Sequence, residues 1–176
     1  MSKGIIAGIA LTLIVGFVGG YILISFGFIP ANADGKPPAL EKWLARKSLR
    51  ATLEREAPQT PNPVALNDQN LIAGINLYDV NCAVCHGASD AKPSNIAIGL
   101  YQRAPQLMKH GVEDDPDGKI YWFIKHGVRL TGMPAFGPTL TDEQLWQLTL
   151  FLKHMDSLTP EAKNAWKSVP SSAPRS

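Results

Sequence analysis

The stretch Cys82-Ala83-Val84-Cys85-His86 decides how the rest of this chain is interpreted. It contains both cysteines of the chain and one of its four histidines. Two thiols three residues apart on one helical turn can both reach the edge of a flat macrocycle, and the imidazole that follows then lies beneath its centre. C-x-x-C-H is the attachment signature of c-type haem. It predicts thioether bonds through Cys82 and Cys85, with His86 as an axial ligand of the iron.

Three other interpretations of the cysteines explain less of the pattern. A thioredoxin-type C-x-x-C requires a βαβ context, and no stretch of the sequence shows convincing strand alternation. A zinc site needs two more ligands at regular spacing, whereas His110, His126 and His154 are scattered. A plain disulfide leaves His86 unexplained. Haem attachment accounts for all three residues of the motif.

A second motif, Thr131-Gly132-Met133-Pro134-Ala135-Phe136-Gly137, supplies a candidate for the sixth iron ligand. A thioether is a weak, neutral ligand, so a loop stiffened by Pro134 lowers the entropy cost of holding it on the metal. A thioether ligand also favours ferrous over ferric iron, which raises the reduction potential of the haem. We therefore predict that Met133 is the second axial ligand. The rivals are Met108, Met155 and the three other histidines. Met155 falls on the apolar stripe of the predicted last helix, and Met108 and His110 fall on a predicted short helix, so these are weaker candidates.

Filling both axial positions from the protein has a chemical consequence. With His86 and Met133 on the iron, no position is open to substrate, so peroxidase, oxygen-reducing and nitrite-reducing chemistry is disfavoured and the chain itself is expected not to be an enzyme. Outer-sphere transfer of single electrons remains, through small and weakly held encounters. The alternative is a haem-based sensor or a low-activity haem enzyme, either of which requires displacement of Met133.

The order of these motifs resembles a class I c-type cytochrome. A helix, C-x-x-C-H, a long loop, T-G-M-P-A-F-G and a final helix follow one another over roughly residues 65–158. The resemblance implies an all-α cytochrome c fold wrapped around one covalently bound haem c with its iron. In this family a glycine and an aromatic on the first helix, matched here by Gly74 and Tyr78, pack against apolar residues on the last.

The resemblance also implies further haem-pocket residues. A proline carbonyl, best matched by Pro105, is expected to accept the N–H of the proximal histidine, and the methionine loop contributes Pro134 and Phe136. The run Tyr121–Arg129 resembles the haem-lining helix of the family. The candidates from that run for the haem wall or the propionates are Tyr121, Trp122 and Arg129. Their alternative role is that of ordinary core aromatics and a surface arginine.

An apolar stretch near the N-terminus predicts one transmembrane helix ahead of this domain. The 26 residues from Gly4 to Ile29 include no charged side chain. At 1.5 Å per residue they are long enough to cross a hydrocarbon core of roughly 30 Å. Ala31-Asn32-Ala33 resembles a cleavage site, but the apolar region of a signal peptide spans only about 7–15 residues. We therefore expect a retained single-pass anchor.

Two arguments about the orientation of this helix conflict. Five basic residues lie within about 20 residues after it, whereas only Lys3 and the terminal amine precede it, and the positive-inside rule alone would place the following domain in the cytoplasm. Haem c attachment in bacteria is expected on the exported side, and the rule is weakest for long exported segments. We therefore expect a bacterial inner-membrane protein with its haem domain in the periplasm.

The sequence divides into a transmembrane anchor (1–30), a periplasmic helix and Pro-rich linker (31–64), a cytochrome c domain (65–158) and a short helix with a flexible tail (159–176). Helices are expected over 39–56, from a cap at Asn67 or Asp68 to about Asn81, around Arg103–His110 and Lys119–His126, from a Thr141 cap to about Asp156, and from Thr159 onward. The helix over 39–56 is basic and has no single apolar face. It either contacts lipid headgroups or a partner subunit, or is an exposed spacer.

The distribution of charge excludes one class of partner. Residues 31–64 carry six basic side chains against four acidic ones, whereas residues 65–158 carry seven against ten. Nucleic-acid binding requires clustered positive charge. Because the globular part is mildly acidic, nucleic acid is excluded as a partner. The expected partners are the membrane and redox proteins such as a dehydrogenase, a quinol-oxidising complex or a terminal oxidase. The chain would serve them as a tethered carrier or as a subunit of a larger complex.

Overall fold

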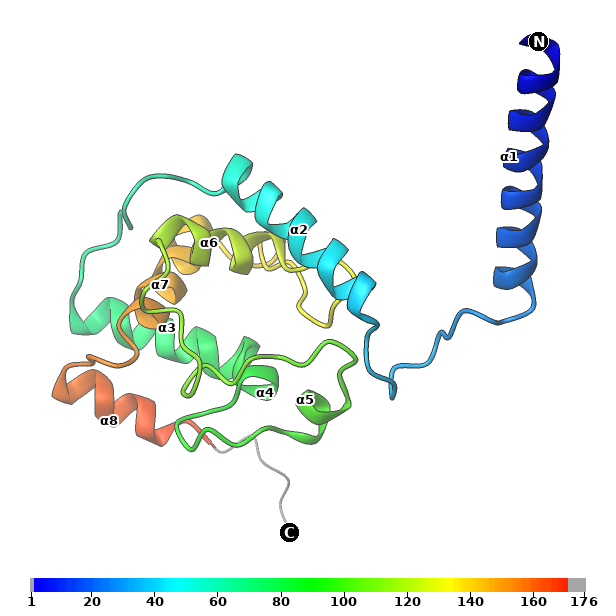
Figure 1. The fold of residues 1–176 in the computed structure, drawn as a ribbon. Coiled ribbons are helices and arrows are strands. Elements are labelled where there is room, and N and C mark those ends of the chain that lie inside the picture. Colours follow the sequence, from blue (N-terminus) through cyan, green and yellow to red (C-terminus); the bar gives the residue numbers. More distant parts are fainter. Residues whose placement is uncertain (1, 171–176) are drawn as a thin grey trace. The chain divides into compact units, whose positions relative to one another are not determined.

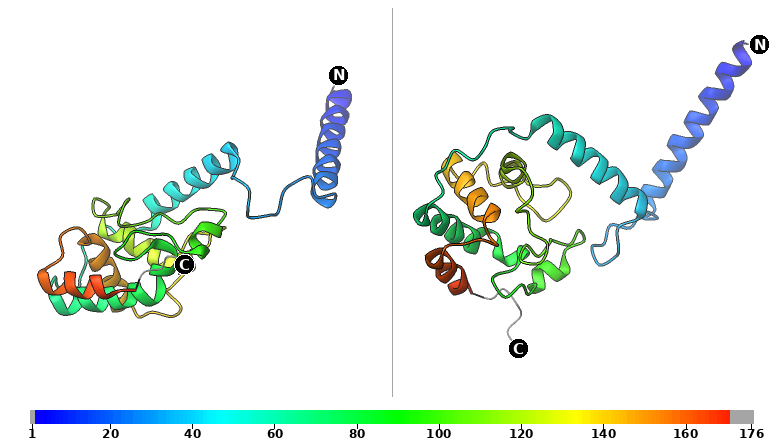
Figure 2. Two further views of the ribbon diagram at one scale, coloured as in Figure 1. Left: turned by 90° about the horizontal axis from the view of Figure 1, so that it is seen from below. Right: turned by 60° about the vertical axis from the view of Figure 1, so that its left-hand side comes forward.

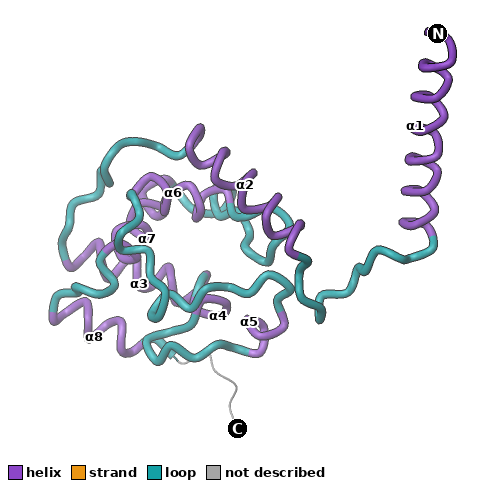
Figure 3. Tube along the Cα trace, viewed as in Figure 1, coloured by secondary structure: helices purple, strands orange, loops and turns teal. Residues whose placement is uncertain are grey.

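The computed structural model describes residues 2–170, and the expected flexible tail lies almost entirely outside this range. The chain divides into two compact units, Met1–Ala33 and Asp34–Ser176. Helices joined by long loops make up the described part of both, and it contains no β-strand (Figure 3). This confirms the predicted all-α class with one apolar helix ahead of the larger unit in the sequence.

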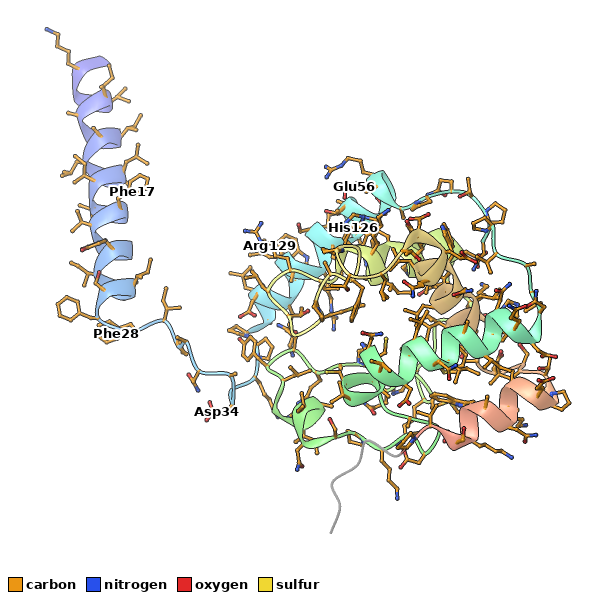
Figure 4. The ribbon with its side chains drawn as sticks, turned by 180° about the vertical axis from the view of Figure 1, so that it is seen from behind. Phe17, Phe28, Asp34, Glu56, His126 and Arg129 are labelled. Atoms are coloured by element: carbon orange, nitrogen blue, oxygen red, sulfur yellow. The ribbon has the colours of Figure 1, made fainter. Side chains whose placement is uncertain are left out.

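The first unit is built on helix α1 (Ser2–Ser25). The helical stretch Lys3–Ser25 is long and apolar enough to cross a membrane, and none of it is buried within the protein. Its own large apolar side chains are exposed on all sides of the helix, and Phe17 is one that Figure 4 labels. A helix that is apolar all round suits a lipid environment. These features fit the predicted anchor.

The end of α1 differs from the sequence expectation, which extended the helix to Ile29. Gly27 adopts φ +72°, a left-handed conformation that glycine reaches without steric cost. The N–H of Gly27 donates to Ile24 O at 3.1 Å, and the N–H of Phe28 donates to Leu23 O at 3.0 Å. This pair of bonds is a Schellman motif, which terminates a helix by satisfying its last carbonyls. The residues at and after this turn are still apolar, so hydrophobicity alone does not reveal where the helix ends.

The second unit contains seven further helices among the described residues. They are α2 (Ala39–Glu56), α3 (Asp68–Asn81), α4 (Ala83–His86), α5 (Asn95–Gly99), α6 (Asp117–His126), α7 (Asp142–Lys153) and α8 (Pro160–Ser168). Helix α7 packs against both α3 and α6, and α8 packs against α3 (Figures 1 and 2). The core therefore forms where the first and last parts of the domain meet.

The contact between α3 and α7 has no room for a side chain at Gly74. A β-carbon there would lie 2.3 Å from the carbonyl oxygen of Gln147 and 2.8 Å from Cβ of Phe151. Beside it, the rings of Tyr78 and Phe151 pack edge to face with centroids 5.4 Å apart, and Trp166 of α8 adds a second edge contact to Tyr78 at 5.3 Å. This confirms the packing of Gly74 and Tyr78 that the family resemblance implied.

Side-chain caps set the starts of α3 and α7, both of which the sequence predicted. Asn67 caps α3 by accepting from Asn70 N. Thr141 and Gln144 form a reciprocal capping box at the start of α7, in which each side chain accepts a bond from the other residue's N–H. Helix α2 has the expected bounds. Helix α7, by contrast, ends at Lys153 and not near Asp156, because the residues after it form turns.

One expected helix, Arg103–His110, is absent. The segment is extended and then makes a short turn at 107–109. Two of its hydrogen bonds go to the end of the C-x-x-C-H motif: Leu107 N–H donates to His86 O at 3.2 Å, and the Gln106 amide donates to Cys85 O at 3.1 Å. These tertiary bonds outweigh local helix propensity.

Candidate functional site

The residues of both motifs line one open, mostly apolar cavity in the second unit. Its empty space is about 680 Å³, with the open solvent at the mouth included. The lining consists of Asn81, Cys82, Cys85, His86, Leu100, Gln102, Arg103, Ala104, Pro105, Val128, Thr131, Gly132, Met133, Pro134 and Phe136. Two thiols, an imidazole and a thioether therefore face one space, although Met133 lies far from the other three in the sequence.

The attachment motif is held in a single helical turn. The N–H of His86 donates to Cys82 O at 2.9 Å, so α4 presents both cysteines and the histidine as the spacing predicted. The hydroxyl of Tyr78 on α3 donates to Gly87 O at 2.7 Å in a fully buried bond. That bond fixes the chain just after His86 to the helix core.

The imidazole of His86 is oriented by the segment that replaces the expected helix. Its Nδ1 lies 2.9 Å from the carbonyl oxygen of Pro105. A carbonyl can only accept, so Nδ1 carries the proton and Nε2 keeps its lone pair. Such a bond fixes both the tautomer and the ring plane of a ligating histidine. The site therefore presents a metal-binding nitrogen.

Burial sets the protonation of the three attachment residues. It raises the pKa of the Cys82 thiol to about 12 and also raises the pKa of Cys85, so both are neutral thiols near pH 7. Burial lowers the pKa of His86, an effect that the bond to Pro105 partly opposes. The imidazole is therefore neutral, which is the form that binds a metal. None of the three groups carries a charge into the apolar cavity.

Met133 lies on a loop that is fastened to the end of α6. The N–H of Val128 donates to Met133 O at 3.2 Å, which closes the loop. The hydroxyl of Thr131 donates to Val128 O at 2.7 Å and accepts from the N–H of Met133 at 3.1 Å. Three residues after Met133, the N–H of Phe136 donates to Ile124 O at 3.1 Å, so the loop also satisfies a carbonyl that α6 leaves open.

Two residues of the site were not singled out from the sequence. Arg103 is the only cation among the described residues that line the cavity, and Gln106 bonds the loop to the attachment helix. Neither position belongs to a spacing pattern or a motif. Their roles follow from the extended course of residues 103–106, where we expected a short helix.

The structure does not bring Tyr121, Trp122 and Arg129 to the cavity lining. The ring of Tyr121 stacks on Trp146 of α7 at 4.1 Å between centroids. Trp122 packs 5.1 Å from the ring of His126. Arg129 is exposed on the loop after α6, where Figure 4 labels it. In the structure, therefore, the two aromatics lie in helix contacts and Arg129 lies at the surface.

These observations fit a porphyrin with an iron centre. The cavity is apolar, presents one neutral imidazole nitrogen and one thioether, and has two protonated thiols on its edge. The all-α fold and this site define a class I c-type cytochrome domain, which carries one covalently bound haem c. Comparison with known proteins agrees: residues 69–152 match the family model described as "Cytochrome C oxidase, cbb3-type, subunit III".

Curated relatives carry related descriptions. Two are cbb3-type cytochrome c oxidase subunits FixP, from Rhizobium meliloti (strain 1021) and Sinorhizobium medicae (strain WSM419). Both are 28% identical to this chain, over 127 and 126 residues, which is 65% and 64% of this chain and 41% of each relative. A third is the quinohemoprotein alcohol dehydrogenase ADH-IIG of Pseudomonas putida, 32% identical over 123 residues, or 66% of this chain and 16% of the relative.

The chain thus spans about two fifths of the length of the FixP relatives that it matches. No solved structure matches it. The part that the family model matches is the cytochrome domain, and an apolar helix near the N-terminus precedes it in the sequence.

Proposed function

We propose that this chain is a membrane-anchored monohaem cytochrome c that passes single electrons to or within a terminal oxidase complex. The observation that carries the proposal is the convergence of Cys82, Cys85, His86 and Met133 on one cavity. The match to the cbb3-type subunit III model supports a terminal oxidase among the possible redox partners. The chain would act as a tethered carrier or as the electron-transfer subunit of that complex.

The residues have separate tasks in this proposal. Cys82 and Cys85 would hold the porphyrin through thioether bonds, and His86, oriented by Pro105, would supply an imidazole nitrogen to the iron. Met133 would supply the thioether and so exclude exogenous ligands. Bound in this way, the haem iron supplies reversible one-electron chemistry between its ferrous and ferric forms. Arg103, at the cavity lining, supplies a permanent positive charge to pair with haem carboxylates.

The anchor and the orientation follow from the same proposal. Helix α1 would cross the bacterial inner membrane once and keep the haem domain in the periplasm. A tether of this kind raises the local concentration of donor and acceptor without a large interface. Protease treatment of spheroplasts is expected to remove the haem-bearing part, and full protection would contradict the periplasmic orientation.

The proposal is tested on the full chain, tagged at its C-terminus and extracted from membranes in mild detergent. A denatured sample is expected to show haem-dependent staining at the mass of this chain, which Cys82→Ser/Cys85→Ser loses. Co-purification of stoichiometric oxidase subunits supports the subunit role, and a lone band supports the tethered carrier. Absence of staining in the unmodified chain would overturn the whole assignment.

A further inference from the structure

Helix α2 has one face on which long basic side chains surround a tryptophan. Along this face, which we call the basic strip, lie Lys42, Trp43, Arg46, Lys47 and Arg50, and together with Ala39 they border an open surface hollow. All five side chains are exposed. The strip contains no acidic residue, although α2 as a whole has three glutamates.

Apolar side chains next to the basic strip are also exposed. Leu40, Trp43 and Leu44 expose 67%, 61% and 53% of their surface. They share the first two turns of α2, so they form one apolar end beside the cations. Exposed large apolar residues grouped in this way mark an interaction surface more often than isolated ones do.

The other side of α2 is attached to the cytochrome domain. Leu53 is buried, and α2 packs against α6 (Figure 1). At its first turn, Glu41 accepts a bond from the Tyr101 hydroxyl at 2.9 Å and from the Gln102 amide at 3.3 Å. Helix α2 is therefore a fixed part of the domain, and the basic strip is a defined surface of it.

Gln102 connects this surface to the haem site. It lines the cavity that holds the two motifs, and it is bonded to Glu41, the residue before the first cation of the strip. Whatever binds the basic strip therefore sits on an element that directly contacts the wall of the haem cavity.

We infer that the basic strip and its apolar end bind anionic phospholipid headgroups of the membrane that α1 spans. Residues 26–38 join α1 to α2 in the sequence, so the strip is tethered close to a bilayer. Lys and Arg attract anionic headgroups within a Debye length of the surface. Tryptophan and leucine suit the boundary between headgroups and acyl chains. The charge and composition of the strip thus complement a lipid surface.

The inference assumes that α1 spans a membrane, but it does not depend on the identity of the redox partner. Its consequence is that the haem domain lies against the bilayer in a preferred orientation. Contact through the strip would restrict the directions in which the cavity mouth can meet membrane-bound donors and acceptors.

The test uses the full chain in nanodiscs made of phosphatidylcholine alone or with one third phosphatidylglycerol. Amine-reactive labelling followed by mass spectrometry reads the accessibility of Lys42 and Lys47. Labelling of both is expected to be about tenfold slower with phosphatidylglycerol, and this protection is expected to disappear in high salt because exposed charges are screened. Lys163 and Lys167, exposed on α8, are expected to label equally in both lipids.

A charge-reversed pair makes the test specific. Arg46→Glu/Arg50→Glu is expected to abolish the lipid-dependent protection of Lys42 and Lys47, whereas Lys163→Glu/Lys167→Glu, with the same change in net charge, is expected to retain it. Equal labelling of the unmodified chain in both lipids would overturn the inference. Protection that appears in native membranes and not in anionic nanodiscs would also overturn it, because a protein would then cover the strip.

Discussion

Gly127, the residue after α6, lies directly against the backbone of Met133: a β-carbon on Gly127 would be 2.6 Å from the carbonyl oxygen of Met133 and 2.6 Å from the carbonyl carbon of Pro134. Gly127 also has φ +64°, which disfavours any other residue. The end of α6 and the candidate iron ligand are therefore in contact through a position that only glycine fits.

Gly127→Ala is expected to displace the methionine loop. The added methyl group collides with carbonyl atoms that cannot rotate away, and the left-handed conformation adds strain of about 1–3 kcal/mol. The ferric protein is expected to lose the weak red absorption band of thioether-ligated haem, as measured in an oxidised spectrum at room temperature. Gly99→Ala is the control, because a β-carbon at Gly99 meets nothing within 4 Å. An unchanged band in Gly127→Ala would show that the loop is not positioned by this contact.

Met133→Ala is expected to open the sixth coordination position. The reduced variant is expected to bind carbon monoxide rapidly, and its potential is expected to fall, because the thioether favours ferrous iron. Flash photolysis and a redox titration measure the two effects. Met108→Ala changes a methionine that is 39% exposed and outside the cavity lining, so it is expected to match the unmodified chain. Rapid carbon monoxide binding by the unmodified chain would instead favour the sensor or enzyme alternative.

Gly74→Ala tests the helix contact independently of the ligands. The methyl group would overlap the carbonyl oxygen of Gln147, and overpacking of this kind costs roughly 1–3 kcal/mol. Thermal unfolding followed by far-ultraviolet circular dichroism is expected to show a lower midpoint, while the spectrum of the folded haem protein at low temperature is unchanged. Asn76→Ala, at an exposed position of the same helix, is expected to leave the midpoint almost unaltered. An unaltered midpoint in Gly74→Ala would mean that α3 and α7 can separate at no cost.

Asp142→Asn is expected to weaken the dependence of stability on acid pH. The hydrogen bond from Tyr121, aided by Lys125, lowers the pKa of Asp142 in the folded chain. A lowered carboxyl pKa stabilises the fold above the unfolded pKa of about 3.9, and that stabilisation is lost as the pH falls through the folded value. The side chain is 66% exposed, so the effect is expected to stay below about 1 kcal/mol.

The measurement is the unfolding midpoint between neutral pH and about pH 2.5, a range that spans the unfolded pKa of aspartate. The variant is expected to be less stable than the unmodified chain at neutral pH, with the difference closing in acid. Glu143→Gln removes a neighbouring carboxylate of the same helical turn and is expected to preserve the slope of the unmodified chain. A difference between Asp142→Asn and the unmodified chain that stays constant with pH would exclude titration as its cause.

How far the sequence predicted this structure depends on whether a feature is local. The helix caps at Asn67 and Thr141 were predictable because each involves a side chain and an N–H three residues away. The turn of C-x-x-C-H was predictable for the same reason. The segment 103–110 was mispredicted because Gln106 and Leu107 donate hydrogen bonds to Cys85 and His86, which lie well before them in the sequence. The local sequence pattern carries no information about such tertiary hydrogen bonds.

The candidate site shows the same division. The two motifs could be found by spacing, and the structure places Cys82, Cys85, His86 and Met133 around one cavity. The position of Tyr121 could not be predicted in this way. Its hydroxyl donates to Asp142 and accepts from Lys125, so Tyr121 lies in the contact between α6 and α7. A run of aromatic residues predicts burial, but it does not show whether a given ring lies at the cavity or in a contact between helices.

The packing of α3 against α7, with its apolar contacts and the hydrogen bond from the Gln147 amide to Asn70 at 3.1 Å, holds together both ends of the segment that carries the two candidate iron ligands. Breaking the iron–sulfur bond would therefore release a short excursion of the chain, while the helical framework stays intact. Slow amide exchange is expected in α3 and α7, and fast exchange in 128–135, so reversible ligand loss and global unfolding become separate events. An electron-transfer domain built in this way can lose and regain its weak ligand many times without refolding.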